Sequence, residues 1–148
     1  MVIPSRFYSQ PPYKVRKTIT FTGATNLGAV GAAPLFTVTG EVMVAFIVPF
    51  CSTSLVENGA TTTMALGVTG NTALFIAASE PEDIDANEFW QAVAPADVGG
   101  VALAALLQDI LISANILLTI ANDTVTGGVL EVTVYWWPLS NDGSIVAA

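Results

Sequence analysis

Short apolar segments recur about every ten residues along this chain, and turn-forming residues separate them. Lys17 to Thr22 (KTITFT) alternates polar and apolar residues, which is typical of a strand with one buried face. Val42 to Phe50 is apolar throughout and rich in β-branched residues, which favours a strand buried on both faces. The predicted strands are 17–22, 35–39, 42–50, 61–68, 72–78, 105–113, 116–122 and 129–138, with a shorter candidate at 89–93. This rhythm of about eight strands predicts an all-β protein, an antiparallel β-sandwich of the jelly-roll kind.

Turn signals set several of these boundaries. Thr69-Gly70-Asn71 predicts a tight hairpin, and Asp123 to Gly128 predicts another turn. The Ala/Leu content of Val101 to Gln108 is typical of a helix, but the isoleucines that follow favour strands. We therefore expect two strands there, with a helical turn before them.

The charges are divided sharply along the chain. The four basic residues (Arg6, Lys14, Arg16 and Lys17) all precede residue 18, and the 12 carboxylates all follow it. The basic segment also contains three prolines and three aromatic residues, a composition that favours an extended strap. We therefore expect an extended arm of residues 1–17 and a β-sandwich domain of residues 18–148. The arm is predicted to bind a partner through Arg6, Phe7, Tyr8, Tyr13, Lys14, Arg16 and Lys17, with a frayed terminus as the alternative.

Composition limits the classes of partner. Of the 148 residues, 53% are hydrophobic and only 11% are charged, less than half of the usual share of about 25%. Such a surface is easier to explain if copies of the chain cover part of it, so a homo-oligomer is expected. Nucleic acid is not expected as a partner, because the acidic body would repel phosphates.

Enzymatic chemistry is not expected. The chain has no histidine, and residues 18–148 contain no lysine that could activate a nucleophile. Cys51, the single cysteine, follows an apolar run and is interpreted as a small buried hydrophobe. The glycine pairs lack the spacing of a phosphate-binding loop, so no cofactor is expected. A membrane span over Val98 to Ala121 is disfavoured, because Asp109 would lie in mid-bilayer.

Two clusters are weaker candidates for binding sites. Asp83, Asp85 and Asn87 alternate in an acidic loop, which makes them a weak calcium candidate without the glycine and glutamate of a helix–loop–helix site. Trp90, Trp136 and Trp137 are candidate interface aromatics, with a sugar platform as the less favoured interpretation. Adjacent residues on a strand point to opposite faces, so only one of Trp136 and Trp137 can face the core.

Four phrases of the chain carry a resemblance: PLFTVTGEVMV (34–44), LGVTGNTALFIA (66–77), DIDANEFW (83–90) and GGVLEVTVYWWPLSNDGSIVAA (127–148). Together they resemble small virion structural proteins of tailed bacteriophages, of the head-decoration (cement) type. The resemblance implies a jelly-roll or β-sandwich fold that trimerises on the major capsid protein. It also implies a location on the capsid exterior, after synthesis in the bacterial host cytoplasm.

The expected function is therefore structural: binding and stabilising an assembled capsid, without catalysis. A tail-fibre or receptor- and glycan-binding virion module is the alternative. The two differ in what the exposed aromatic residues would contact, which is protein in the first case and sugar in the second.

Overall fold

The computed structural model describes residues 11–91 and 104–148. These residues form ten strands and two short 3-10 helices, η1 and η2. The strands are β1 (Tyr13–Thr20), β2 (Gly31–Thr39), β3 (Val42–Glu57), β4 (Thr63–Val68), β5 (Asn71–Ser79), β6 (Glu88–Phe89), β7 (Ile110–Ile112), β8 (Ile116–Ala121), β9 (Val125–Pro138) and β10 (Ser144–Ala147). The helices are η1 (Pro81–Asp83) and η2 (Ala105–Leu107). The predicted all-β class is therefore confirmed.

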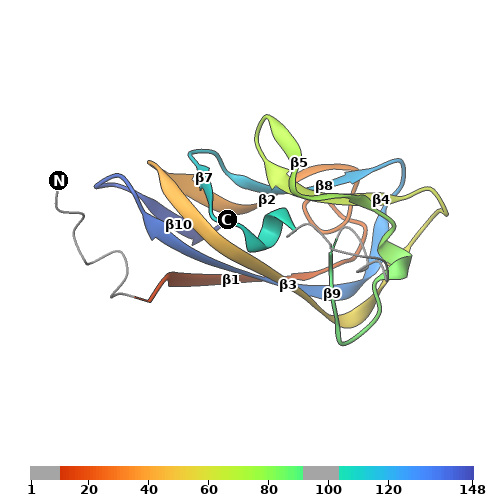
Figure 1. Cartoon of the computed structure of the whole chain (residues 1–148). Helices are drawn as coiled ribbons and strands as arrows, with labels where there is room; N and C mark the ends of the chain where they lie inside the picture. The colour runs from red at the N-terminus through yellow and green to blue at the C-terminus, as the bar shows by residue number, and fades with distance from the viewer. Residues whose placement is uncertain (1–10, 92–103) are drawn as a thin grey trace, which may run out of the picture.

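The strands form two antiparallel sheets of five strands each. The first sheet has the order β1-β9-β3-β6, and β7 pairs with β3 nearer its start, at residues 42–44, whereas β6 pairs at residues 50–51. The second has the order β10-β2-β8-β4-β5. Figure 1 shows the two sheets as separate layers, with β1, β3 and β9 below and β2, β8, β4 and β5 above.

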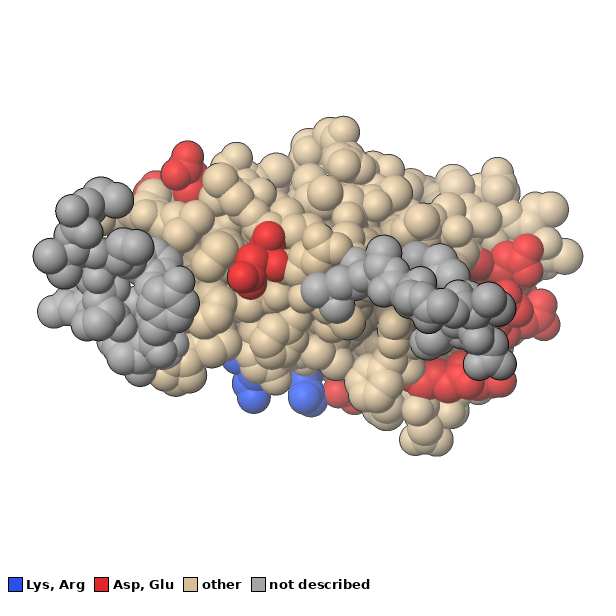
Figure 2. Space-filling view, viewed as in Figure 1, with Lys and Arg blue, Asp and Glu red and all other residues tan. Residues whose placement is uncertain are grey.

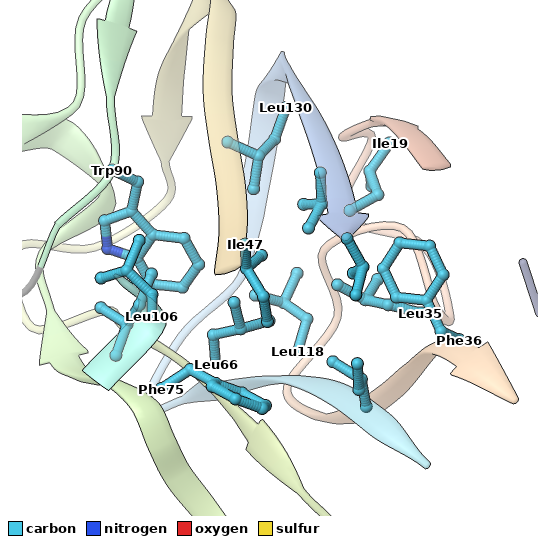
Figure 3. Close-up of a cluster of buried hydrophobic side chains, with 14 of the residues drawn as sticks. Ile19, Leu35, Phe36, Ile47, Leu66, Phe75, Trp90, Leu106, Leu118 and Leu130 are labelled. Atoms are coloured by element: carbon cyan, nitrogen blue, oxygen red, sulfur yellow. The ribbon is translucent and has the colours of Figure 1, made fainter. Parts of the chain in front are cut away.

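Apolar side chains from both sheets form one core between these layers. β3 and β9 supply alternate residues of the first sheet, and β2, β4 and β8 supply the facing residues of the second. Figure 3 shows Ile47 and Leu130 directed toward Leu66 and Leu118 of the opposite sheet. Burial of these side chains is the main stabilising contribution, because each one removes apolar surface from water.

The first strand begins earlier than the sequence predicts. Tyr13 to Lys17, assigned above to the arm, are the first five residues of β1 and pair with Trp136 to Val132 of β9. They belong to the sheet because Val15 packs against the core while Lys14 and Arg16 lie on the opposite face. Any arm therefore ends before Tyr13, and Arg6, Phe7 and Tyr8 lie outside the described residues.

The turn predicted at Asp123 to Gly128 lies mostly inside a long strand. Ser52–Glu57 continues β3, and Val125–Gly128 opens β9; the two segments pair irregularly, with several register shifts. Gly128 has a φ of 101° there, and an added Cβ would lie 2.6 Å from the Ser54 carbonyl oxygen. The glycine therefore marks a close approach of two strands, whereas the sequence suggested a turn.

The predicted strand at 105–113 is only partly correct. Residues 105–107 form η2, and the strand is reduced to β7 at 110–112. The strand expected at 116–122 agrees with β8. A helical turn does precede β7, but as η2 it lies inside the range predicted as strand and not before it. β10 was not expected; it pairs with β2, and its Ile145 is buried.

Candidate interaction surface

The surface of the first sheet that points away from the core is unusually apolar. In β3 a bulge buries both Val44 and Ala45, after which the alternation resumes with Ile47 in the core. Met43, Phe46, Val48 and Phe50 consequently point outward and are half-buried. This corrects the expectation that Val42 to Phe50 is buried on both faces.

Neighbouring strands extend this surface. Tyr135 and Trp137 of β9 lie opposite Phe46 and Met43, Leu111 of β7 lies opposite Met43, and Phe89 of β6 lies opposite Phe50. Leu111 and Phe89 are 60% and 57% exposed. We call this surface the outer face; it consists of Met43, Phe46, Val48, Phe50, Phe89, Leu111, Tyr135 and Trp137.

Ring contacts order the outer face. The Phe46 and Tyr135 rings are stacked with centroids 4.3 Å apart, and the Phe50 and Phe89 rings are tilted at 5.3 Å. An antiparallel sheet with one solvated face ordinarily carries polar residues there. A row of aromatic and aliphatic side chains in that position is typical of a surface that contacts another protein.

Basic side chains border the outer face along β1. Lys14 lies opposite Tyr135, and Arg16 lies opposite Thr133. The Arg16 guanidinium donates to Glu131 Oε2 at 3.0 Å and to Thr133 Oγ1 at 3.3 Å, which explains why Thr133 is buried although it points outward. Lys14 makes no ion pair or hydrogen bond within the described part of the chain.

Lys17 has a different role from the other basic residues. Its ammonium donates to the carbonyl oxygens of Pro34 at 3.0 Å and Ala148 at 2.6 Å. Burial lowers the pKa of Lys17. Lys17 therefore links β1 to the second sheet. Among the predicted partner-binding residues that the structure describes, Lys14 and Arg16 are the ones that border the outer face.

The three tryptophans have three different environments. Trp90 is 1% exposed, and its Nε1 donates to Ser79 Oγ at 2.7 Å, so it belongs to the core and not to an interface (Figure 3). Trp136 is also directed inward, at 7% exposed, and Tyr13 stacks on its ring at 5.0 Å. Trp137 is half-buried on the outer face. The expectation that the adjacent pair divides between the two faces is confirmed.

Several carboxylates gather at one end of the molecule, with others scattered over the visible surface, whereas the described lysines and arginines lie along its underside (Figure 2). We call this cluster the acidic end; it consists of Glu57, Glu80, Glu82, Asp83 and Asp123. Burial, together with the neighbouring carboxylates, raises the pKa of Glu57, and its Oε2 atom is buried without a hydrogen-bond partner. Hydrogen bonds from the Thr124 amide and from Asn58 lower the pKa of Asp123.

The calcium candidate gains no support from this arrangement. The side chain of Asp85 accepts a hydrogen bond from Ser54 Oγ, and the Asp85 amide donates to Glu88 Oε2, so both carboxylates shape a local turn. Asn87 occupies that turn with a φ of 71°. Across the described ranges, no group of three or more Asp, Glu, His or Cys side chains could hold a metal ion, and this includes Asp83.

Cys51 is fully buried, as predicted, and burial raises the pKa of its thiol.

The outer face is the feature that sequence reasoning missed. The outward-pointing residues between Glu131 and Trp137 of β9 indicated this face in the sequence. The bulge at Ala45 concealed the matching alternation of outward and inward residues in β3.

Comparison with known proteins adds no relative to this description. No family model, curated protein or solved structure matches the chain. In the part of the chain that the structure describes, no helix is long and apolar enough to cross a bilayer.

Proposed function

We propose that this protein is a non-catalytic structural component of a tailed-phage virion, which assembles through protein contacts and decorates the capsid. The observation that carries the proposal is the outer face, whose aromatic side chains are directed to solvent beside the basic residues of β1. A cement protein needs such contact surface and no reactive group, because binding only to the assembled lattice stabilises that lattice. The position on the capsid exterior remains a prediction, and the trimer implied by the resemblance is the alternative to the dimer inferred below.

We also propose that the fold is a jelly roll. A jelly roll wraps a long hairpin of four strand pairs into two sheets, as in many capsid proteins. Here β1 pairs with β9, β2 with β8, β3 with β6 and β4 with β5. If β7 and β10 are treated as additions, the remaining eight strands have the orders 1-8-3-6 and 2-7-4-5 in the two sheets. This nested pairing supports the proposal.

The attachment to the capsid is assigned to the segment before β1. This segment contains Arg6, Phe7 and Tyr8. Deleting residues 1–12 keeps β1 intact, so the truncated protein should fold and yet lose binding to capsids of the phage that encodes it. Co-sedimentation with purified capsids measures this, and Val146→Glu on the exposed surface of β10 is a control that should bind normally. Equal decoration by the truncated and full-length proteins would refute the assignment.

Glycan binding is a second candidate, and a specific observation favours it. Tyr13, 55% exposed, stacks on Trp136 beside an open depression of about 690 Å³ that is also lined by Leu139, Ser140 and Asn141. An exposed aromatic ring next to hydroxyl and amide groups suits a sugar. A glycan array with the wild type and Tyr13→Ala tests this candidate, and binding that depends on Tyr13 would favour the fibre or receptor-binding alternative.

A further inference from the structure

We propose that a second copy of this chain occupies the outer face, the two faces packing around a two-fold axis that runs parallel to the strands. The inference rests on the proposed function, in which the outer face is a protein-contact surface, and it names the partner of that surface. The argument depends on the order of strands across the face, on two unpaired charges and on the area available.

The strand order makes the outer face complementary to itself. Across the sheet the strands follow the order β1, β9, β3 and then β6 and β7. A two-fold axis that lies in the interface between β9 and β3 places β9 of one copy over β3 of the other. Tyr135 and Trp137 then meet Phe46 and Met43 of the second copy. The aromatic side chains of each copy thus cover those of the other copy, and the two sheets stack with their strands aligned.

The same rotation places opposite charges together. Lys14 lies on the β1 margin, in register with Tyr135 and therefore with Phe46. Asp109 immediately precedes β7 on the opposite margin, two residues before Leu111, which pairs with Met43. Because the axis is parallel to the strands, positions along the strands are preserved, and Lys14 of one copy faces Asp109 of the second copy. Neither side chain makes an ion pair or hydrogen bond within residues 11–91 and 104–148.

The area is enough for a reversible dimer. Strands lie about 4.8 Å apart and rise about 3.3 Å per residue, so the outer face measures on the order of 20 by 25 Å. Two copies would therefore bury roughly 1,000 Å² in total, which is the lower limit for a specific interface. Interfaces at this lower limit are typical of weak, reversible complexes, so we expect a dissociation constant on the order of 1–100 μM.

Sedimentation velocity over about 1–300 μM protein tests the proposal. The expected species is a dimer of about 31 kDa, twice the chain mass of 15.4 kDa. Phe46→Glu places a charge at the centre of the interface twice, so it should raise the dissociation constant at least about 100-fold. The matched control Val146→Glu makes the same kind of change on β10 of the other sheet and should leave dimerisation unaltered.

A charge swap keeps the proposal testable if Phe46→Glu folds poorly. Lys14→Glu should weaken the dimer about 3- to 30-fold, since two exposed pairs become repulsive. The double variant Lys14→Glu/Asp109→Lys should restore most of the loss, which a general effect of charge would not do.

Three outcomes would overturn the inference: a monomer at 300 μM, a dimer that tolerates Phe46→Glu, or a trimer of about 46 kDa with the same tolerance. None of these would affect the proposed virion function, which capsid co-sedimentation measures separately. Conversely, a dimer with charge-swap rescue supports the inference even if the protein does not bind capsids.

Discussion

Replacing Trp90 by phenylalanine distinguishes a core residue from an interface residue. The indole is 1% exposed, and its Nε1 donates to Ser79 Oγ at 2.7 Å. Losing that hydrogen bond should cost about 0.5–1.5 kcal/mol. The smaller ring leaves a cavity of roughly 40 Å³, which adds about 1 kcal/mol. We expect Trp90→Phe to lower the free energy of unfolding by about 2 kcal/mol.

Urea unfolding followed by far-UV circular dichroism measures this loss without relying on the fluorescence of the tryptophan removed. The midpoint of thermal unfolding should fall by about 6 °C, at about 3 °C per kcal/mol for a chain of this length. Tyr135→Phe on the outer face is the control; it keeps the ring that stacks on Phe46 and should change stability by about 0.5 kcal/mol or less.

A double-mutant cycle isolates the hydrogen bond. Ser79→Ala should cost about 1 kcal/mol, and the double variant should lose about 1 kcal/mol less than the sum of the single losses, because the two residues share one interaction. The reasoning fails if Trp90→Phe unfolds within 0.5 kcal/mol of the wild type, or if the substitution mainly weakens self-association.

Other substitutions test the acidic end and the loop that precedes β2. Burial and neighbouring carboxylates raise the pKa of Glu57 in the folded state. Ionisation of Glu57 therefore lowers the free energy of unfolding as the pH rises from the pKa of the unfolded state to that of the folded state. Glu57→Gln should therefore raise the free energy of unfolding at pH 7, by about 0.5 kcal/mol, and have little effect near pH 3.5, as urea titrations at the two pH values would show. Gly28 has a φ of 118°, and an added Cβ would clash with the Val125 carbonyl oxygen, so Gly28→Ala should cost about 3 kcal/mol or more in a thermal melt. Gly70→Ala, with a φ of 91° but open space around it, should cost less, and equal losses would contradict the steric argument.

Local sequence patterns were sufficient to predict which residues are buried where a strand simply alternates between inward and outward residues. In β9, Leu130, Val132 and Val134 are buried, while Glu131 and Tyr135 are half-buried on the other face, as the period of two predicts. The hairpin at Thr69–Asn71 was equally readable, because its glycine adopts the left-handed conformation that the turn requires.

The errors arose where a distant partner decides the structure. Tyr13–Lys17 look like part of a basic strap, but pairing with β9, more than one hundred residues away, makes them a strand. The same holds for β10, whose partner β2 gives a short segment its order. Trp90 does not belong to a segment of alternating apolar residues, so the local pattern could not predict its burial. That burial depends on Ser79 and on η2, and the sequence does not show that these lie beside it. The outer face was missed because a single bulge shifted the alternation of β3 by one residue.

The charged acidic end and the apolar outer face act at different stages of self-association. Each copy carries a net charge of −8, and the proposed axis brings the two acidic ends to the same end of the dimer, so approaching copies repel one another before they touch (Figure 2). Charges of this kind act mainly on the association rate, and salt screens them over about 10 Å at 0.1 M. The aromatic side chains of the outer face act after contact, because their burial is not screened and controls dissociation. Added salt should therefore speed association of the copies by screening this repulsion, while leaving their dissociation rate nearly constant. Phe46→Glu should instead act mainly on the dissociation rate.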